Sequence, residues 1–269
     1  MAGVLTDLRA HRALVWAFAN RDLSTRYRSS VLGWGWSLVQ PLATLAVFGV
    51  VFSVVFRVQP PPLGNGSGAG NYAAFLFTGI VTWNLFSSIL NLSMSQLRAS
   101  GDLLRKVQFP AWTPILGASI VQLIQVALEL LVLIIMFAFL RNAGWTWILA
   151  IPILVGLLLF AQGLGLVLSI LNARFGDVAQ IVAVVLGALY FITPVLYPIS
   201  LVQEHGTWLA RIVEINPISW YVQAMHDVMY SLVSPPWWEL LALLLGGAVV
   251  FWIGFAIFER TSEDVGELL

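Results

Sequence analysis

Long stretches without charge dominate the hydrophobic pattern of this 269-residue chain. A helix needs roughly 20 mostly apolar residues to cross a bilayer. Windows of that length occur near residues 32–56, 72–96, 111–140, 146–171, 178–197 and 239–258. Because irregular backbone and open sheet edges are too costly in lipid, the pattern predicts an all-α integral membrane protein with six transmembrane helices.

The segment ahead of the first window is basic and aromatic. Within residues 8–28, Trp16, Leu23 and Tyr27 follow spacings of seven and four, which place them on one face of a helix. A basic amphipathic helix of this kind lies in the membrane interface, and it could equally dock on a cytoplasmic partner. We therefore predict an N-terminal amphipathic interface helix.

Basic residues are unevenly divided between the two sides of this arrangement. An even number of spans places both termini on one side, and the side richer in Lys and Arg is cytoplasmic. One side carries Arg9, Arg12, Arg21, Arg26, Arg28, Arg98, Arg105, Lys106, Arg174 and Arg260, and the other carries Arg57, Arg141 and Arg211. Both termini are therefore predicted to be cytoplasmic.

Two connections between the windows have contrasting character. Residues 59–71, QPPPLGNGSGAGN, predict a Pro- and Gly-rich external loop, which we expect to be mobile. Residues 98–110, RASGDLLRKVQFP, predict a compact cytoplasmic turn with a short helix, a suitable size for contact with a partner.

The connection between the fifth and sixth windows is broken by proline. Pro194, Pro198 and Pro217 interrupt half-apolar stretches that are too short to span. Such backbone is tolerated near membrane depth only against protein or a water-filled path, so we predict short re-entrant external helices. The predicted domains are residues 1–31 for the interface helix, 32–259 for the transmembrane domain, with this external segment at 198–230, and 260–269 for a cytoplasmic tail.

Composition supports a membrane location and narrows the chemistry. The chain is 59% hydrophobic and 10% charged, whereas about a quarter of the residues in a soluble domain are charged. Thirteen basic and thirteen acidic residues cancel, so charge does not indicate a nucleic-acid partner. The absence of cysteine excludes disulfides and thiolate metal sites.

No motif for nucleotide binding is present. The single lysine, Lys106, follows Arg105, so the phosphate-binding loop G-x-x-x-x-G-K-[ST] occurs nowhere in the chain. ATP is therefore not bound here by that route.

Catalytic and metal sites are also not indicated. His11, His205 and His226 lie far apart and give no metal-ligand spacing. The acids are scattered, so an enzyme would need residues such as Asp102, Asp177 and Glu259 to converge around a metal. We predict no catalytic residue, metal site or cofactor in this chain.

Two polar stripes run inside the apolar windows. Ser119, Gln122, Gln125 and Glu129 form one, and Asn84, Ser87, Asn91, Ser95 and Arg98 form the other. An ionised carboxylate at the centre of a span costs ~2.5–3.5 kcal/mol or more and is a functional candidate by default. Helix packing by hydrogen bonds is favoured for the stripe of Glu129, whereas packing and a conduit wall for a hydroxyl-rich substrate stay equally open for the other.

Aromatic residues recur through the first window and at the end of the fifth. They are Trp34, Phe48, Phe52 and Phe56 in the first, and Tyr190, Phe191 and Tyr197 in the fifth. Aromatic faces suit the apolar CH faces of sugar rings, and tyrosine keeps a hydroxyl for their edges. Core packing and lipid contact are the more common use of such a stripe.

Four stretches together resemble a known family: RDLSTRYRSSVLGWGWSLVQPL, DLLRKVQFPAWTPIL, TPVLYPIS and NPISWYVQAMHDVMY. In order and spacing they are similar to the membrane subunits of bacterial polysaccharide-exporting ATP-binding-cassette (ABC) transporters, the permeases for O-antigen, teichoic acid and related lipid-linked glycans. The resemblance covers about residues 8–260. Low lysine with high arginine, alanine and valine content also fits a galactan exporter of a GC-rich bacterium.

This resemblance implies a homodimeric permease in the bacterial inner membrane. Two copies of a separate ABC ATPase, which would hold ATP and Mg²⁺, are implied on the cytoplasmic side. The interface helix and a coupling loop at residues 98–110 would rest on these ATPases, with Asp102, Arg105, Lys106 and Phe109 as coupling residues. Residues 198–230 would form an external gate.

The implied substrate is a polysaccharide linked to polyprenyl diphosphate. The substrate path would comprise Trp34, Phe48, Phe52, Phe56, Asn84, Asn91, Tyr190, Phe191 and Tyr197. Arg21, Arg26 and Arg28 would contact the lipid diphosphate, because arginine pairs bidentately with phosphate oxygens. One departure is that His226 and Asp227 stand where the family often has a basic residue, which puts a charge-based role there in doubt.

Two alternatives stay open. One is an ABC permease for drugs or lipids, and the other is an integral membrane enzyme such as a lipid-linked glycosyltransferase.

Overall fold

The computed structural model of the protein describes residues 10–26, 33–52, 60–107 and 109–268. Among the predicted site residues, Arg28 and Phe56 lie outside this part of the chain. The side chains of Trp34 and Phe48 also lie outside the description, although their backbone is included.

All regular elements in the described part are helical, which confirms the predicted all-α class. In chain order they are α2 (Arg12–Thr25), η1 (Gly33–Gly35), α3 (Trp36–Val50), α4 (Tyr72–Ala99), α5 (Gly101–Lys106), α6 (Trp112–Phe139), η3 (Trp145–Leu149), α7 (Ala150–Arg174), α8 (Val178–Ile192), α9 (Ile199–His205), α10 (Thr207–Ile215), α11 (Pro217–Met225), η4 (His226–Tyr230) and α12 (Trp237–Leu268).

Within the described residues, four helices are long and apolar enough to cross a membrane. They are α4, α6, the continuous run Trp145–Arg174 that joins η3 to α7, and Trp237–Thr261 of α12. The windows at 32–56 and 178–197 give shorter apolar helices, in α3 and α8. The predicted spans are therefore confirmed for four windows, and the count of six stays a prediction.

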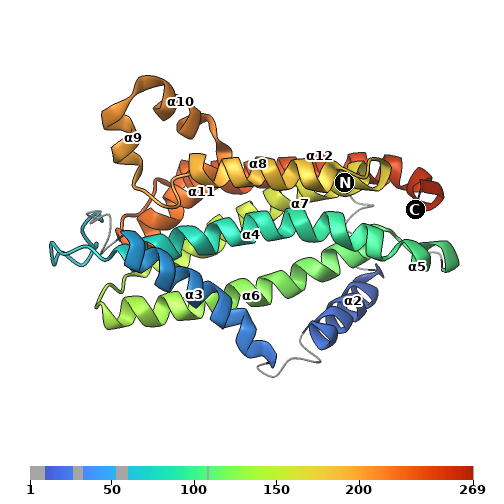
Figure 1. Ribbon diagram of the computed structural model, residues 1–269, viewed down its shortest axis with the longest axis horizontal. Helices are drawn as coiled ribbons and strands as arrows, with labels where there is room; N and C mark the ends of the chain where they lie inside the picture. The colour runs from blue at the N-terminus through green and yellow to red at the C-terminus, as the bar shows by residue number, and fades with distance from the viewer. Residues whose placement is uncertain (1–9, 27–32, 53–59, 108, 269) are drawn as a thin grey trace.

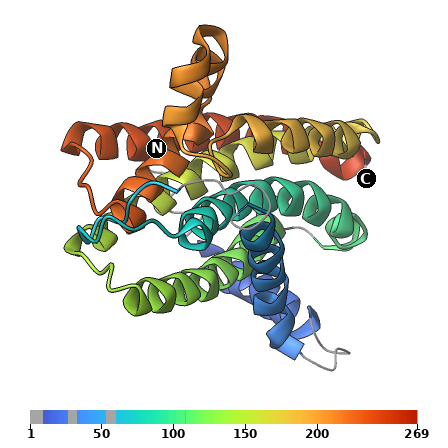
Figure 2. The ribbon, with the colours of Figure 1, turned by 60° about the vertical axis from the view of Figure 1, so that its left-hand side comes forward.

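The long helices run side by side along the long axis of the molecule (Figure 1). The short helix α5 lies at one end of this bundle, and α9, α10 and α11 lie at the other. A second view shows that α9 and α10 project away from the bundle (Figure 2). The predicted cytoplasmic turn and the predicted external segment thus lie at opposite ends of the molecule.

Helix α4 is the central element. Its most apolar stretch is 78% buried, against 22% for α12. The outward side chains of α12 are large and apolar, including Leu245, Val249 and Ile253. In a membrane protein such a surface faces lipid, so α12 is at the periphery and α4 is in the core.

Helices α7 and α12 meet through paired glycines. Gly156 and Gly163 on α7 face Gly247 and Gly254 on α12, and the two glycines of each helix are seven residues apart. A Cβ atom on Gly247 would collide with the carbonyl oxygen of Gly156, and one on Gly254 with that of Gly163. Small residues at such positions let helix backbones approach closely, which makes this contact tight.

Hydrogen bonds anchor residues 60–71 to the end of the bundle that carries α9, α10 and α11. The side chain of Asn65 donates to the carbonyl oxygen of Leu140 at 3.0 Å, and its backbone N–H donates to Asn142 Oδ1 at 3.0 Å. Tyr230 Oη donates to the carbonyl oxygen of Pro61 at 2.6 Å. The composition led us to expect a mobile loop, but these long-range bonds hold it against the α6–η3 connection and η4.

Candidate functional site

The two polar stripes meet around one cavity between α3, α4 and α6, here called the inner cavity. Its volume is about 190 Å³. The residues that line it are Arg26, Ser37, Pro41, Thr44, Ile80, Asn84, Ser88, Gln122, Gln125 and Glu129. Ser88, rather than the neighbouring Ser87 of the predicted stripe, faces this cavity.

Pro41 explains why a polar side chain is needed at this point. Proline has no N–H, so the carbonyl oxygen of Ser37, four residues earlier in α3, lacks its usual helical donor. Gln125 Nε2 donates to this oxygen at 2.5 Å and also to Glu129 Oε1 at 3.1 Å. A neighbouring helix therefore supplies the donor that proline cannot supply, as is required inside a membrane.

Two acceptor atoms on this wall keep no protein donor. Gln125 and Glu129 are only 7% and 2% exposed. Within the described part of the chain, Gln125 Oε1 and Glu129 Oε2 accept no hydrogen bond. Asn84 on α4 is a further polar neighbour of the carboxylate. Buried polar atoms are nearly always hydrogen-bonded, so this wall is suited to a ligand or water that donates.

Residues in the stripe of Glu129 have two different roles: some pack against neighbouring helices, and some line the inner cavity. Ser119, at its first position, turns toward α7 and donates to Gln162 Oε1 at 2.5 Å. Gln125 packs against α3 and lines the cavity at the same time. The favoured interpretation, helix packing by hydrogen bonds, describes part of this stripe, and the cavity adds a second use.

A larger cavity of about 600 Å³, here called the mouth cavity, adjoins the inner one. Its lining residues are Arg26, Ser88, Asn91, Leu92, Met94, Ser95, Arg98, Gln122, Asn172 and Ala179. Arg26, Ser88 and Gln122 line both cavities. Since Asn84 and Arg98 are 14 residues apart on α4, the polar wall extends about 21 Å at ~1.5 Å per residue.

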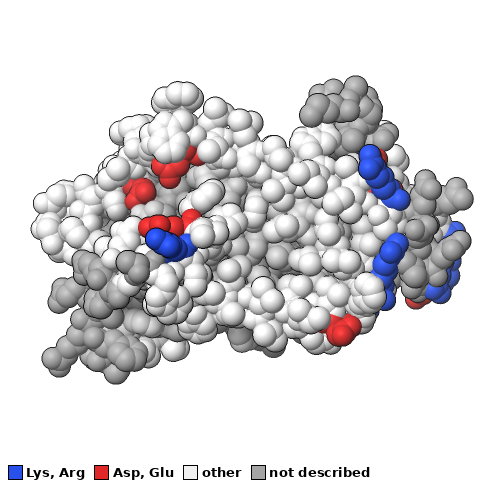
Figure 3. Space-filling view, turned by 90° about the horizontal axis from the view of Figure 1, so that it is seen from above, with Lys and Arg blue, Asp and Glu red and all other residues white. Residues whose placement is uncertain are grey.

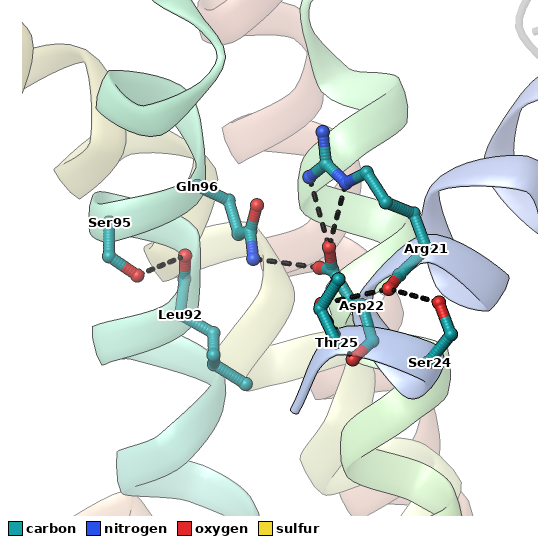
Figure 4. A network of polar contacts seen from close by, with 7 residues as sticks. All are labelled: Arg21, Asp22, Ser24, Thr25, Leu92, Ser95 and Gln96. Carbon is teal, nitrogen blue, oxygen red and sulfur yellow. Dashed lines mark hydrogen bonds and ion pairs between the residues drawn. The ribbon is translucent and has the colours of Figure 1, made fainter. Parts of the chain in front are cut away.

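Arg21 is engaged in fixing α2 to α4. Its guanidinium donates to Asp22 Oδ1 at 2.9 and 3.1 Å, and Gln96 Nε2 of α4 donates to Asp22 Oδ2 at 2.8 Å (Figure 4). The guanidinium also lies over the ring of Phe18. Of the three arginines predicted to contact a diphosphate, Arg26 lines both cavities, Arg21 belongs to this network and Arg28 lies outside the described residues.

The predicted aromatic path is not gathered around these cavities. Phe52 stacks on Tyr72, with ring centroids 5.3 Å apart. Tyr190 packs edge-on against Trp83 at 5.4 Å, and Phe191 is exposed. Phe52 lies two residues beyond the end of α3, whereas Tyr190 and Phe191 are on α8, and α3 and α8 lie on different sides of α4 in both ribbon views (Figures 1 and 2).

Other predicted path residues have separate surroundings. Tyr197 Oη donates to the carbonyl oxygen of Ile192 at 2.8 Å and is not part of either cavity lining. Asn84 and Asn91 line the inner and the mouth cavity, respectively. The structure therefore brings the two amides of the predicted path to one groove and leaves its described aromatic residues elsewhere.

The predicted coupling residues lie at the end of the molecule where α5 is found. Asp102, Arg105 and Lys106 are exposed on α5. Phe109 packs against Phe18 of α2, with ring centroids 5.5 Å apart, which connects this turn to α2. Figure 3 shows basic side chains gathered toward this end and a broad uncharged zone across the middle of the same face.

Two of the three short helices at the opposite end begin at a proline. Pro198 precedes α9, Pro217 opens α11, and the Asn216 side chain accepts from the backbone N–H of Ile218 at 3.1 Å. His226 is buried, stacks on Phe75 with centroids 4.0 Å apart and has Nε2 3.0 Å from the Phe75 carbonyl oxygen. Burial lowers the pKa of His226 to about 4, so it carries no positive charge at neutral pH.

Several residues of the site were not singled out from the sequence. These residues are Pro41 with Ser37, Gln96, and Asn172, which donates to the carbonyl oxygen of Met94 at 3.3 Å. A proline inside an apolar window was the available signal, because it implies an unpaired carbonyl four residues before it. The described residues contain no group of three or more His, Asp and Glu side chains that could hold a metal ion.

Comparison with known proteins identifies the family. The family model described as "ABC-2 type transporter" matches residues 13–230. The O-antigen export system permease protein RfbA of Myxococcus xanthus is 29% identical over 268 residues, which is 99% of each chain. RfbA of Klebsiella pneumoniae is 27% identical over 95% of each chain. The polysialic acid transport protein KpsM of Escherichia coli is 25% identical over 96% of this chain and 97% of its own length. This helical chain, with its two adjoining polar cavities, therefore belongs to the membrane family of ABC-2 type transporters.

Proposed function

We propose that this chain is the membrane subunit of an ABC exporter for a polysaccharide linked to polyprenyl diphosphate, which it moves from the cytoplasm to the outer side of a bacterial inner membrane. The names of the relatives, two O-antigen permeases and a polysialic acid transporter that match along nearly the whole chain, support this substrate class.

The observation that carries the proposal is the pair of adjoining cavities. The mouth cavity is lined by two arginines, Arg26 and Arg98, and by no acidic residue. Arginine suits phosphate oxygens, so this end matches the diphosphate of a lipid carrier. The inner cavity is lined mainly by amides, hydroxyls and one carboxylate. These groups match the hydroxyls of a sugar better than they match a drug or a lipid tail.

Energy for export would come from a separate ATPase. The chain has no phosphate-binding loop. The exposed α5, with Asp102, Arg105 and Lys106, and the adjoining α2 give such a partner a contact surface. Phe109 would transmit movement between these two elements, because it packs on α2 from the end of the coupling loop.

A second copy of the chain would complete the membrane domain. Helix α8 carries a broad exposed apolar surface that includes Ile181, Val184 and Val185, and Leu186 is its one buried residue. We place six spans in each copy, with both termini in the cytoplasm, and assign the gate to α9, α10 and α11 at the outer end. Tyr190 and Phe191, also on α8, would then face the path at the subunit boundary.

Depletion of the protein from its native cell, followed by labelling of lipid-linked glycans, tests the function. The proposal predicts that full-length polymer on its diphosphate lipid accumulates on the cytoplasmic side. If the polymer is never made, the chain belongs to synthesis and the transport function is wrong.

The ATPase partner has a test of its own. The proposal predicts that the purified chain hydrolyses no ATP and that an ABC ATPase co-purifies with it in equal amounts. ATP hydrolysis by the chain alone would contradict this division of labour.

A further inference from the structure

We propose that the inner cavity binds a sugar unit of the exported polymer through its hydroxyl groups, with Gln125 Oε1 and Glu129 Oε2 as acceptors. Glu129 would then be the residue that favours sugar over apolar cargo. The inference rests on the proposed function, of which it names one substrate contact.

The position of the site suits a polymer in transit. Glu129 is the 18th residue of the 28-residue α6, and Asn84 is the 13th residue of the 28-residue α4. Both therefore lie near the middle of helices that are long enough to cross the membrane. The contact would be made at depth, where bulk water does not compete for the acceptors.

The wall that carries the acceptors is held in place before any ligand arrives. Gln125 Nε2 is fixed by two bonds, one to the Ser37 carbonyl oxygen, four residues before Pro41, and one to Glu129 Oε1. These bonds orient the amide so that its oxygen and the second carboxylate oxygen remain without a protein donor among the described residues. A preorganised site loses less entropy on binding.

The two acceptors determine which ligand chemistry fits. A buried acceptor without a donor costs about 1–3 kcal/mol, so an apolar ligand in this cavity would leave that cost in place for both atoms. An anionic group would be better placed in the mouth cavity, which both Arg26 and Arg98 line. Two neighbouring hydroxyls of one sugar can donate one hydrogen bond to each of these two acceptor atoms.

Size and access agree with this assignment. The inner cavity, at about 190 Å³, exceeds the share of liquid volume of one water, about 30 Å³, several-fold. It therefore has room for several hydroxyl-sized groups rather than for one bridging water. The shared residues Arg26, Ser88 and Gln122 connect it to the mouth cavity, so a sugar could enter behind a diphosphate held at the mouth.

A single thiol on the shared wall provides the test. The chain has no cysteine, so Ser88→Cys introduces one thiol where both cavities meet. The variant is purified with its ATPase in lipid nanodiscs, and the rate of maleimide labelling of this chain is measured. Two probes are added separately: lipid-linked polymer extracted from depleted cells, and polyprenyl diphosphate that carries no sugar. Ser24→Cys, exposed on α2, serves as the control thiol.

We expect the lipid-linked polymer to slow labelling of Ser88→Cys about tenfold, and the sugar-free lipid to slow it little. Glu129→Leu in the same background should remove most of the protection, and Glu129→Gln, which keeps one acceptor oxygen and the shape, should remove part of it. Ser119→Ala is the matched control, because this hydroxyl lies on the same helix but bonds to Gln162. In the Ser119→Ala background, the lipid-linked polymer should slow labelling of the Ser88→Cys thiol as much as it does without this substitution.

Equal protection by the sugar-free lipid would show that the lipid head occupies the cavity and would overturn the inference. Undiminished protection in both Glu129 variants, or no protection by the polymer at all, would overturn it as well, leaving a water-filled cavity. Glu129→Gln decides the question if Glu129→Leu fails to fold. If depleted cells accumulate polymer and the thiol is not protected, the inference fails while the proposed function stands; if no polymer accumulates, both fail.

Discussion

The two sides of α4 are built in opposite ways. On one side, α7 and α12 approach so closely that a Cβ atom on Gly247 or Gly254 would strike the facing backbone. On the other side, α3, α4 and α6 enclose polar cavities in which a glutamine replaces a missing backbone hydrogen bond. Close packing leaves no room for a ligand, whereas a cavity sacrifices dispersion contacts and keeps polar atoms available. We infer that the first side is scaffold and the second side carries substrate.

The largest effect is expected on the scaffold side, where α12 offers a matched pair of adjacent glycines. Gly247→Ala places a Cβ atom against the carbonyl oxygen of Gly156, whereas a Cβ atom on Gly246 meets nothing within 4 Å. Overpacking of this kind costs about 1–3 kcal/mol. We expect Gly247→Ala to lower the midpoint of thermal unfolding in detergent by several degrees.

Gly246→Ala is the control for that experiment. Alanine forms helix more readily than glycine by about 1 kcal/mol in water, so this variant should unfold at or slightly above the wild-type temperature. Equal destabilisation by Gly246→Ala and Gly247→Ala would mean that α7 and α12 do not pack closely at Gly247.

The substrate side can be tested by a double-mutant cycle between α3 and α6. Gln125→Leu removes the donor to the Ser37 carbonyl oxygen and should cost about 1–3 kcal/mol of unfolding free energy. In a Pro41→Ala background the new backbone N–H can bond to Ser37, so the same substitution should cost about 1 kcal/mol less. Thermal unfolding of the four proteins measures the difference.

Part of the cost should persist in that background, because Gln125 also donates to Glu129 Oε1. If Gln125→Leu costs the same unfolding free energy with Pro41 and in the Pro41→Ala background, Gln125 does not replace the backbone donor that proline lacks.

The smallest effect is expected where α2 meets the substrate side. Gln96→Leu removes the hydrogen bond from α4 to the Asp22 carboxylate. Arg21 still holds the Asp22 carboxylate, so α2 should loosen without unfolding. We expect trypsin to cleave after Arg26 a few-fold faster in the purified complex.

Ser95→Ala provides the neighbouring control, since its hydroxyl donates to the Leu92 carbonyl oxygen of its own helix (Figure 4). Its cleavage rate should equal that of the wild type. Faster cleavage in this control, or an unchanged rate in Gln96→Leu, would show that the Asp22 network does not anchor α2.

The parts of this comparison that could be predicted from the sequence are those with a periodic signal. The windows predicted the four long helices, and the spacings from Gln122 to Glu129 and from Asn84 to Arg98 predicted two polar stripes, because one helix face repeats every three to four residues. The prolines between the fifth and sixth windows indicated interrupted segments there, and α9 and α11 begin directly after Pro198 and at Pro217.

What the sequence could not supply is the pairing between distant elements. The periodicity of α6 does not say that Gln125 faces Ser37, 88 residues away, or that the glycines of α7 face those of α12. Composition also does not reveal how residues 60–71 are anchored, because the bonds from Asn65 and Tyr230 to this loop join residues far apart in the chain. Aromatic spacing, for its part, does not distinguish a lining residue from a packing residue such as Phe52.

The most direct test of the central claim is to ask which side of α4 the polymer touches during export. A photo-crosslinking amino acid is placed at Ser88, between the two cavities, or at Val249, on the exposed face of α12. Cells that are making the polymer are irradiated, and the purified chain is probed for attached glycan. The account predicts a glycan adduct at position 88 and none at position 249. An adduct at position 249 with none at position 88 would contradict it.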